Sequence, residues 1–312
     1  MNIQRYKKII KRLFSQKYYL RTMALVKLAP LFSDRKYLEL MFPMRVGYKL
    51  NLDNPQTYNE KLQWLKLYDR RPEYTQMVDK VEAKKFVANI IGEEHIIPTI
   101  AVYDRVEDIN FETLPNQFVL KCTHDSGGIV VCKDKSKLNK KAALAKLERG
   151  LSRNYYYQNR EWPYKNVKPR IIAEKYMSNG GEELEDYKVH NFNGTPEVIL
   201  VCRDRYKETG LTEDFFSHHW EHLDILRPDH PQASKPISRP KELEEMIRLS
   251  EKLSKDIPFV RTDFYTINNK VYFGELTFFP SSGMKTFIPD KWDKTFGDWI
   301  KLPTGGETVR KL

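Results

Sequence analysis

The chain reads Phe259-Val-Arg-Thr-Asp-Phe-Tyr-Thr-Ile267, then Asn268-Asn269, then Lys270-Val-Tyr-Phe-Gly-Glu-Leu-Thr-Phe278. This pattern predicts two antiparallel strands joined by a tight turn. Successive side chains of a strand point to opposite faces, so Arg261 and Asp263 share one face, as do Glu275 and Thr277. The other positions are mostly large and apolar, and a charged face among them is costly unless something binds there.

Two carboxylates beside one guanidinium suit a site that holds Mg2+ between phosphate oxygens and stabilises charge during phosphoryl transfer. The alternative is a buried Arg-Asp-Glu ion-pair cluster without a ligand. The hairpin alone leaves both interpretations open, so the rest of the chain has to distinguish them.

Length and composition predict a globular protein of several parts. A chain of 312 residues exceeds a typical single core, which favours two or three subdomains around one cleft. A hydrophobic content of 40% excludes a disordered chain. Cys122, Cys132 and Cys202 form no CxxC pair, which favours reduced thiols in a cytoplasmic protein, and the apolar runs are too short to span a bilayer.

The N-terminal segment is strongly basic. Residues 1–30 hold eight lysines and arginines, and the first acidic residue is Asp34. Apolar residues from Ile3 to Phe14 recur at helical spacing, which predicts an amphipathic helix that could lie on the anionic inner face of the cell membrane or bind an acidic partner. The alternative is that the apolar stripe of this helix packs on the protein itself and its lysines face water. No nucleic-acid module accompanies the net charge of +11, so nucleic acid is not expected, and nothing in the sequence indicates an oligomeric state.

Upstream of the hairpin, the pattern alternates between helices and strands. A capping-box spacing at Thr57-Tyr-Asn-Glu60 begins a helix, and Asn193-Gly194 is a strong hairpin signal between two apolar runs. Residues 207–238 are polar and form an excursion from the sheet. The other predicted elements are helices over 78–91, 139–153 and 240–255 and strands over 118–122, 129–132 and 170–177.

Taken in chain order, these motifs resemble the ATP-grasp superfamily. D-alanine–D-alanine ligases have an Arg-Val-Asp-Phe strand, a Glu-x-Asn strand and then Pro-Gly, and here Arg261-Thr-Asp-Phe264, Glu275-Leu-Thr277, Pro280 and Gly283 take those places. The closer resemblance is to the TupA-like (teichuronopeptide-type) ATP-grasp proteins of bacterial surface-polysaccharide loci, over about residues 45–302. The residues that carry it are Tyr58-Asn-Glu-Lys61, Asp79-Lys80, Leu114-Pro115, Val119-Leu-Lys121, Asp186-Tyr-Lys-Val189, Phe192-Asn-Gly194, Phe273-Gly-Glu-Leu-Thr277 and Trp292-Asp293.

The resemblance implies an α+β ATP-grasp fold, in which two α/β subdomains clasp ATP behind a helical N-terminal region. The expected parts are a basic helical segment over 1–50, a helical and α/β region over 51–115, a lid subdomain with the glycine-rich loop over 116–180, and a C-terminal subdomain with the metal and catalytic residues over 181–312.

The resemblance also implies a nucleotide site. Lys121 ends a buried strand and would bring positive charge to the ATP phosphates, while Ser126, Gly127 and Gly128 close over them. His124, Asp125 and Ser126 could touch the phosphates or only make the turn. Lys80 and Lys188 would be further phosphate-directed residues, or equally solvated lysines. The segment Glu174, Lys175, Tyr176 and Met177 would bond the adenine through its backbone edge, and Glu182 or Glu183 would reach the ribose.

The hairpin would form the metal end of this site. Asp263 and Glu275 would bind Mg2+, and Arg261 would stabilise the phosphate in transfer. Thr277 departs from the asparagine of the wider superfamily, which makes a second metal ion less certain. His218, His219 and His222 lie in a polar segment and are interpreted as a surface loop rather than a metal site.

The implied activity is that of an ATP-dependent carboxylate-amine ligase, which forms an amide bond through an acyl phosphate. The family context implies an acid or amine from capsule, O-antigen or teichuronic-type polysaccharide, for example a free or glycan-linked uronic acid joined to an amino acid. Arg203, Arg205 and Lys207 could meet an anionic substrate or face solvent. Two other hypotheses stay open: a glycosyltransferase of a polysaccharide locus, and a non-catalytic ATP-grasp-like scaffold at the membrane.

Overall fold

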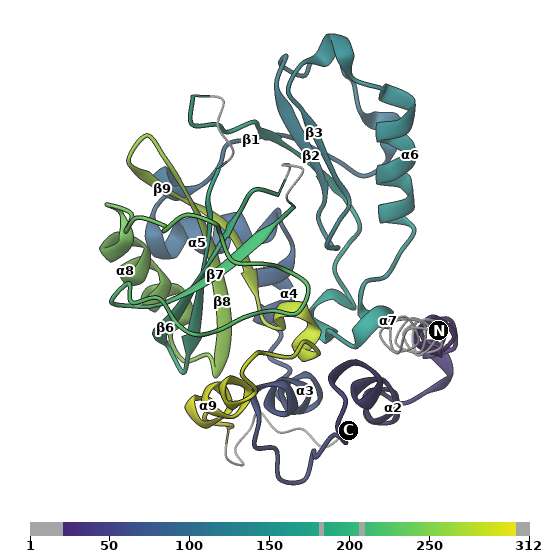
Figure 1. Ribbon diagram of the computed structural model, residues 1–312. Coiled ribbons are helices and arrows are strands. Elements are labelled where there is room, and N and C mark those ends of the chain that lie inside the picture. The colour runs from purple at the N-terminus through teal and green to yellow at the C-terminus, as the bar shows by residue number, and fades with distance from the viewer. Residues whose placement is uncertain (1–20, 181–183, 206–209, 304–312) are drawn as a thin grey trace, which may run out of the picture.

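The computed structural model describes residues 21–180, 184–205 and 210–303 and places two antiparallel sheets one above the other (Figure 1). The smaller sheet has the strand order β1-β4-β2-β3 and the larger one has the order β7-β6-β5-β8-β9. Helices α2, α3 and α9 gather below the larger sheet (Figure 1).

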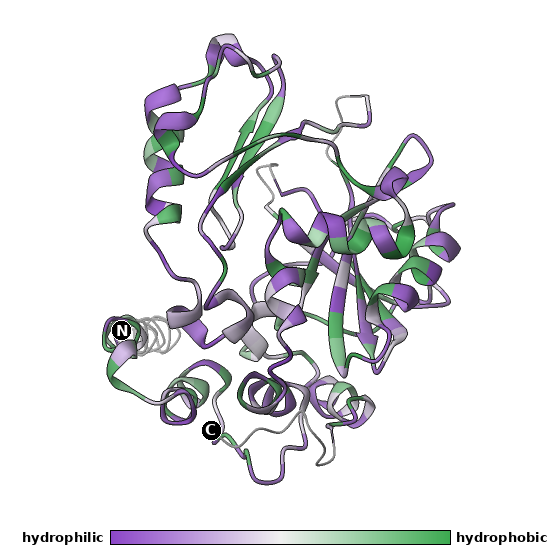
Figure 2. Cartoon of the chain, turned by 180° about the vertical axis from the view of Figure 1, so that it is seen from behind, coloured by the Kyte–Doolittle hydropathy of each residue, from purple (hydrophilic) through white to green (hydrophobic). Residues whose placement is uncertain are grey.

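The smaller sheet consists of β1 (Thr99–Tyr103), β2 (Phe118–Cys122), β3 (Ile129–Cys132) and β4 (Ile171–Lys175). One side of it is covered by α6 (Lys140–Leu151), whose N-terminus is capped by the Asn139 side chain. Phe118, Leu120 and Leu147 are fully buried between them. Figure 2 shows the strands largely hydrophobic and the helix alternating between hydrophobic and hydrophilic residues, as expected for an element with one buried side.

The larger sheet consists of β5 (Asp186–Phe192), β6 (Thr195–Arg203), β7 (Thr212–Ser217), β8 (Phe259–Ile267) and β9 (Lys270–Thr277). The predicted hairpins and their turns are confirmed: Asn193, Asn268 and Asn269 all have positive φ, as short hairpin turns require. Helix α8 (Leu243–Ser254) packs on β5, β6 and β8. The opposite face of the sheet is the one that carries Arg261.

The helical base contains α2 (Asp34–Val46), α3 (Tyr58–Tyr68) and α9 (Lys291–Trp299). The predicted capping box is present, with Thr57 and Glu60 each accepting a backbone N–H of the other. The remaining elements are η1 (Ala29–Leu31), α4 (Glu73–Val78), α5 (Glu82–Ile91), η2 (Glu93–His95), η3 (Val106–Asp108), η4 (Lys135–Lys137), α7 (Tyr156–Asn159), η5 (Trp162–Tyr164) and η6 (Pro280–Gly283).

The structure corrects some predicted boundaries. The helix predicted over 78–91 is divided, because α4 ends at Val78 and the Asp79 carboxylate accepts the N–H of Val81 before α5 begins. The strand predicted over 170–177 ends at Lys175. The basic helix predicted within residues 1–20 lies outside the described residues. The domain boundaries stay predictions, and β1, from the 51–115 segment, pairs with β4. No helix in the described ranges is long and apolar enough to cross a membrane.

Candidate active site

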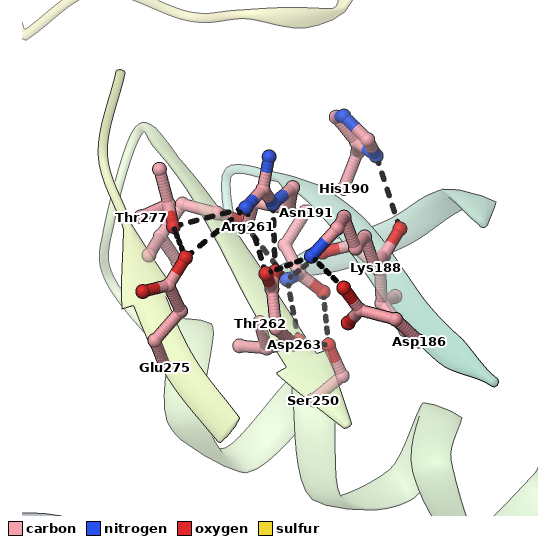
Figure 3. A network of polar contacts seen from close by, with 12 residues as sticks. Asp186, Lys188, His190, Asn191, Ser250, Arg261, Thr262, Asp263, Glu275 and Thr277 are labelled. Carbon is pink, nitrogen blue, oxygen red and sulfur yellow. Dashed lines mark hydrogen bonds and ion pairs between the residues drawn. The ribbon is translucent and has the colours of Figure 1, made fainter. Parts of the chain in front are cut away.

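Strands β5, β8 and β9 bring a group of polar side chains to one face of the larger sheet (Figure 3). In the ladder, Arg261 pairs with Thr277, and Asp263 pairs with Glu275 on one side and with Lys188 on the other. Partners in antiparallel register point to the same face. The shared face predicted from alternation is therefore confirmed for Arg261, Asp263, Glu275 and Thr277, and Lys188 joins them.

The cluster is tightly paired around Asp263. The Arg261 Nε and Nη2 atoms donate to the two Asp263 oxygens at 2.6 and 2.7 Å. Arg261 Nη2 also lies 3.2 Å from Thr277 Oγ1 and 3.4 Å from Glu275 Oε1. Lys188 Nζ bridges Asp263 and Asp186, at 2.6 Å from each. Asp186 was not predicted, although it lies two residues before Lys188 on the same strand face.

Burial and charge act in opposite directions on these groups. Burial alone would raise the pKa of Asp263, but Arg261 and Lys188 outweigh it and hold that pKa below the usual range. For Asp186, burial dominates over Lys188, and the pKa is raised. Glu275 differs from both, because 46% of its side chain is exposed. The cluster is therefore closed at Asp263 and open at Glu275.

The donor set fits the magnesium ion that the resemblance implies. Glu275 Oε2 makes no hydrogen bond among the described residues and is free to bind an ion. Both Asp263 oxygens already accept from Arg261 and Lys188, so Asp263 would have to exchange one of these partners for the ion. Mg2+ commonly takes one or two carboxylates and completes its shell with phosphate oxygens and water. No group of three or more candidate ligand side chains occurs in the described part of the chain, so phosphate would have to supply part of the shell. Thr277 Oγ1 donates to Glu275 Oε1 at 3.2 Å.

A second charged group lies between the two sheets. Glu174, at the end of β4, is 4% exposed and accepts from Lys84 Nζ at 2.5 Å and from Lys121 Nζ at 2.6 Å. Burial raises the pKa of Glu174, but Lys121 and Lys84 bring it down to about 2. Lys84 was not predicted from the sequence, although it lies on α5, four residues after Lys80, which precedes that helix.

One pocket connects the two charged groups. It is lined by residues of α4, α5, the small sheet and β9. Its lining residues are Met77, Val78, Lys80, Ala83, Lys84, Lys121, Tyr164, Glu174, Phe273, Gly274, Glu275 and Leu276. Lys80, Lys121, Glu174 and Glu275, all predicted from the sequence, therefore surround one space.

The glycine loop between β2 and β3 closes against the same region. Lys80 Nζ donates to the Asp125 carbonyl at 2.6 Å, and His124 contacts the Arg153 carbonyl at 2.9 Å, so His124 is turned away from the pocket by a partner of its own. Gly127 has φ of +121°, and a Cβ on Gly128 would lie 2.8 Å from Cys122 Sγ. Ser126 is exposed at the loop tip.

Some predicted residues lie at the margin or beyond the described chain. Lys175 is exposed, and Tyr176 and Met177 follow the end of β4. Arg203 pairs with Glu185, and Arg205 reaches Asp186 at 3.4 Å. Glu182, Glu183 and Lys207 fall outside the described residues. His218 and His222 pair with Glu197 and Asp214. The segment 207–238 is not wholly an excursion from the sheet, as the sequence had predicted, because β7 (Thr212–Ser217) pairs with β6.

Two sheets with a lysine-lined pocket between them, and a strand pair carrying an Arg-Asp-Glu cluster at its edge, define the ATP-grasp class. Within that class, the model of the TupA-like ATP-grasp family matches residues 60–301, and the chain belongs to this family. The predicted α+β fold and family are thereby confirmed.

Several solved structures are similar to the chain at low sequence identity. D-alanine–D-alanine ligase from Bacillus anthracis, complexed with ATP, is 20% identical over 64% of this chain, with a TM-score of 0.38. The ligase from Helicobacter pylori is 15% identical over 78% of this chain and 69% of its own, with a TM-score of 0.42. The chain spans 54% of the length of the Bacillus anthracis ligase. No curated protein matches the sequence.

Proposed function

We propose that the chain is an ATP-dependent ligase that joins a carboxylic acid to an amine. The observation that carries the proposal is the continuity of the pocket, which runs from Lys121 and Glu174 to Glu275 beside Arg261. In this reaction, a carboxylate oxygen of the acid bonds to the γ-phosphorus of ATP as ADP leaves. The amine nitrogen then bonds to the acyl carbon, loses a proton, and phosphate leaves.

The charged residues would divide this work between two ends of the pocket. Lys121 would bind phosphate oxygens of the nucleotide, and Arg261 would stabilise negative charge on the phosphoryl group in transfer and on the acyl phosphate. Asp263 and Glu275 would hold Mg2+, which neutralises charge between phosphate oxygens when it is bound. Phosphoryl transfer needs mostly positioning and charge stabilisation, and this cluster offers both.

The substrate class we propose is an anionic sugar acid of a cell-surface polysaccharide or its precursor, joined to an amino acid or another amine. The support is the resemblance to polysaccharide-locus proteins, together with the basic side chains of Arg203 and Arg205 next to the Asp186 end of the cluster. The adenine would bond the backbone after Glu174, at Lys175 to Met177.

We also propose that residues 21–31 contact the anionic inner face of the membrane. Leu28 and Leu31 are 48% and 77% exposed, and Arg21 and Lys27 lie in the same segment. Exposed apolar side chains next to basic ones favour an anionic lipid surface. Cosedimentation with vesicles that contain phosphatidylglycerol, but not with phosphatidylcholine vesicles, is the expected result, and equal binding to both would contradict it.

The ligase proposal is tested by ADP release. The wild-type protein is screened with ATP, Mg2+ and all pairs from a panel of acids and amines, and the product is identified by mass spectrometry. Release should need both an acid and an amine and should be lost in Glu275→Gln. Glu251→Gln, an exposed position on α8, is the matched control that keeps it. Turnover of a nucleotide sugar without ATP would instead support a glycosyltransferase, and the absence of both reactions would support a scaffold.

A further inference from the structure

Arg227 is a buried arginine outside the cluster described above. It lies in the segment between β7 and α8 and is 7% exposed. Its guanidinium stacks on the Phe287 ring, with 3.9 Å from Cζ to the ring centre, and Nη1 donates to the carbonyls of Lys285 and Thr286 at 3.0 and 3.2 Å. The side chain is therefore held in one orientation by an aromatic ring and two backbone oxygens.

The other edge of this guanidinium lacks a partner. In the ranges that the structure describes, no carboxylate forms an ion pair with Arg227, and Nε and Nη2 have no hydrogen-bond acceptor. Glu213 and Asp293 are close enough to act on its charge but do not pair with it. Buried arginines are usually paired, because an uncompensated charge in a low-dielectric environment is costly.

Arg227 lies over the same sheet face as Arg261. Its Cζ is 5.9 Å from the centre of the Phe215 ring. Phe215 pairs with Leu200, Leu200 with Lys188, and Lys188 with Asp263, so these side chains form one row across the sheet. In that row, Phe215 is at the opposite end from the β8–β9 hairpin. Arg227 is thus on the far side of Arg261 from the nucleotide pocket.

His190 lies between the two arginines on this face. Its ring centre is 6.4 Å from that of Phe215, next to Arg227, and its strand partner is Arg261. Burial lowers the pKa of His190 to about 3, and the positive charges of Arg261 and Arg227 add to the effect. His190 is therefore neutral and adds no positive charge between the two guanidinium groups, of which Arg261 is paired with Asp263 and Arg227 is not paired with a carboxylate in the described ranges.

Tyr58 supplies a further unsatisfied group in the same place. It is 1% exposed, and its hydroxyl has no hydrogen-bond partner among the described residues. The ring is held at 5.2 Å from Phe259 and 5.9 Å from Phe287, the ring on which Arg227 stacks. Burial raises the pKa of this hydroxyl, and Arg227 and Arg261 are close enough to oppose that shift. A buried hydroxyl without a partner and a guanidinium edge without an acceptor are what an anionic group would satisfy.

We propose that Arg227 and Tyr58 bind a second anionic group of the substrate, a carboxylate or a phosphate, while its reacting carboxylate lies at Arg261. The proposal rests on the ligase function proposed above and makes it more specific. The chain then selects acids that carry two negative groups. One group binds at Arg261 and the other at Arg227, on opposite sides of His190. Arg227 is a specificity-determining residue in this account and takes no part in phosphoryl transfer.

The test measures binding of simple probes without nucleotide or amine. Isothermal titration calorimetry compares α,ω-dicarboxylates of increasing length with monocarboxylates of the same carbon number. In the wild type, one dicarboxylate length should bind at least tenfold more tightly than its monocarboxylate. An ω-phosphonocarboxylate series of matched length shows whether the second group is a carboxylate or a phosphate, according to which series binds more tightly.

Variants show which residues are responsible for the preference for acids with two anionic groups. Arg227→Met should bring the two classes of acid to within about twofold of each other, since one bidentate contact is removed. Arg239→Met, an exposed arginine of the same segment paired with Glu244, should keep the tenfold preference. Tyr58→Phe removes only an unpaired hydroxyl, so it should fold like the wild type and reduce the preference several-fold.

The outcomes separate this inference from the ligase proposal. If the wild type prefers no dicarboxylate or phosphonocarboxylate at any length, or if the preference survives in Arg227→Met, the inference is wrong. Should Arg227→Met fail to fold, an unchanged preference in Tyr58→Phe would overturn it instead. A clear preference together with no ADP release from any acid and amine would overturn the ligase function and leave the anion site standing.

Discussion

Arg261 and Arg160 are both buried arginines beside acidic residues, yet one borders a pocket and the other is sealed within the helical base. Arg160 lies after α7 and is 1% exposed. Its guanidinium packs on the rings of Tyr37 and Tyr156, at 4.4 and 5.1 Å, and lies 3.1 Å from Asp34. It also donates to the carbonyls of Ala29 and Phe32, so it joins α7 to η1 and α2.

The partners of the two arginines differ in what they leave open. Asp34 accepts from Arg70 and from the Tyr156 hydroxyl besides its contact with Arg160, and its side chain is 18% exposed. Among the partners of Arg261, Glu275 is 46% exposed and lines the pocket. A buried ion pair is therefore weak evidence of function by itself, and an acidic partner with a free oxygen facing a pocket is stronger evidence.

The largest expected effect is a loss of activity, and it is expected at the Arg261 cluster, which borders the pocket and is called the open cluster. Arg261→Met should lower ADP release about 10³-fold, because the charge on the transferred phosphoryl group loses its guanidinium. The free energy of unfolding should fall by only about 1–2 kcal/mol, since Lys188 still pairs with Asp263 at 2.6 Å. Single-turnover kinetics and urea unfolding measure the two quantities. A loss of stability as large as that of an Arg160 variant would remove the distinction between the clusters.

At the Arg160 cluster, which is sealed within the helical base and is called the closed cluster, the expected effect is on stability. Arg160→Met should lower the free energy of unfolding by about 3–4 kcal/mol, because the carbonyls of Ala29 and Phe32 and the buried side of Asp34 lose their donor. The folded fraction should release ADP at the wild-type rate within about twofold. A large loss of kcat in protein shown to be folded by circular dichroism would mean that the helical base acts on the site.

Glu174 is an intermediate case, since it is buried and paired but lines the pocket. Its pKa of about 2 lies below the value of 4.5 that it has when unpaired. Its contribution to stability is therefore complete above about pH 4.5 and is lost as the pH falls toward 2. From that difference, the contribution is at most about 3 kcal/mol.

Urea unfolding between pH 5 and pH 3 tests this linkage. The wild type should lose more stability over this range than Glu174→Gln, which has no carboxylate to protonate at that position. Glu251→Gln, exposed on α8, should follow the wild type. Parallel curves for wild type and Glu174→Gln would show that the two lysines do not hold this carboxylate charged.

How much of this could be predicted from the sequence depends on how local each signal is. The β8–β9 hairpin, its Asn268-Asn269 turn and the capping box at Thr57 are fixed by residues within a few positions of one another, and all are present. Alternation along β8 and β9 also predicted the shared face of Arg261 and Glu275. The resemblance added Lys121 and Glu174, which the fold does bring to one pocket.

The missed residues depend on contacts between distant segments. Lys84 is on α5 and meets Glu174 of β4 only because the small sheet folds back over the helix. Arg227 lies in a polar segment without periodicity, and its place over Phe215 follows from the pairing of β7 with β6. Lone lysines and arginines carry no signal of burial in the sequence, since most of them are solvated.

The smallest expected effect separates the two lysines that share Glu174. Lys84 Nζ also donates to the Ile97 carbonyl at 2.7 Å and to Thr99 Oγ1 at 3.1 Å. Together with Glu174, these acceptors use all three N–H donors of Lys84. Lys121 Nζ has only Glu174 among the described residues, at 2.6 Å, and its side chain is 21% exposed. Lys121 therefore has donors left for a phosphate, and Lys84 does not.

The matched variants are Lys121→Met and Lys84→Met. Lys121→Met should weaken Mg-ATP binding about tenfold, or about 1.4 kcal/mol. It should lower the free energy of unfolding by only about 1 kcal/mol, since Lys84 still pairs with Glu174 at 2.5 Å. Lys84→Met should change nucleotide affinity less than about threefold and lower stability by about 1–2 kcal/mol, because it leaves two acceptors without a donor. Calorimetric titration with a non-hydrolysable ATP analogue and urea unfolding measure both quantities in each variant. If the two variants exchanged these effects, free donors would be a poor guide to function, and the distinction between the Arg261 and Arg160 clusters would lose its basis as well.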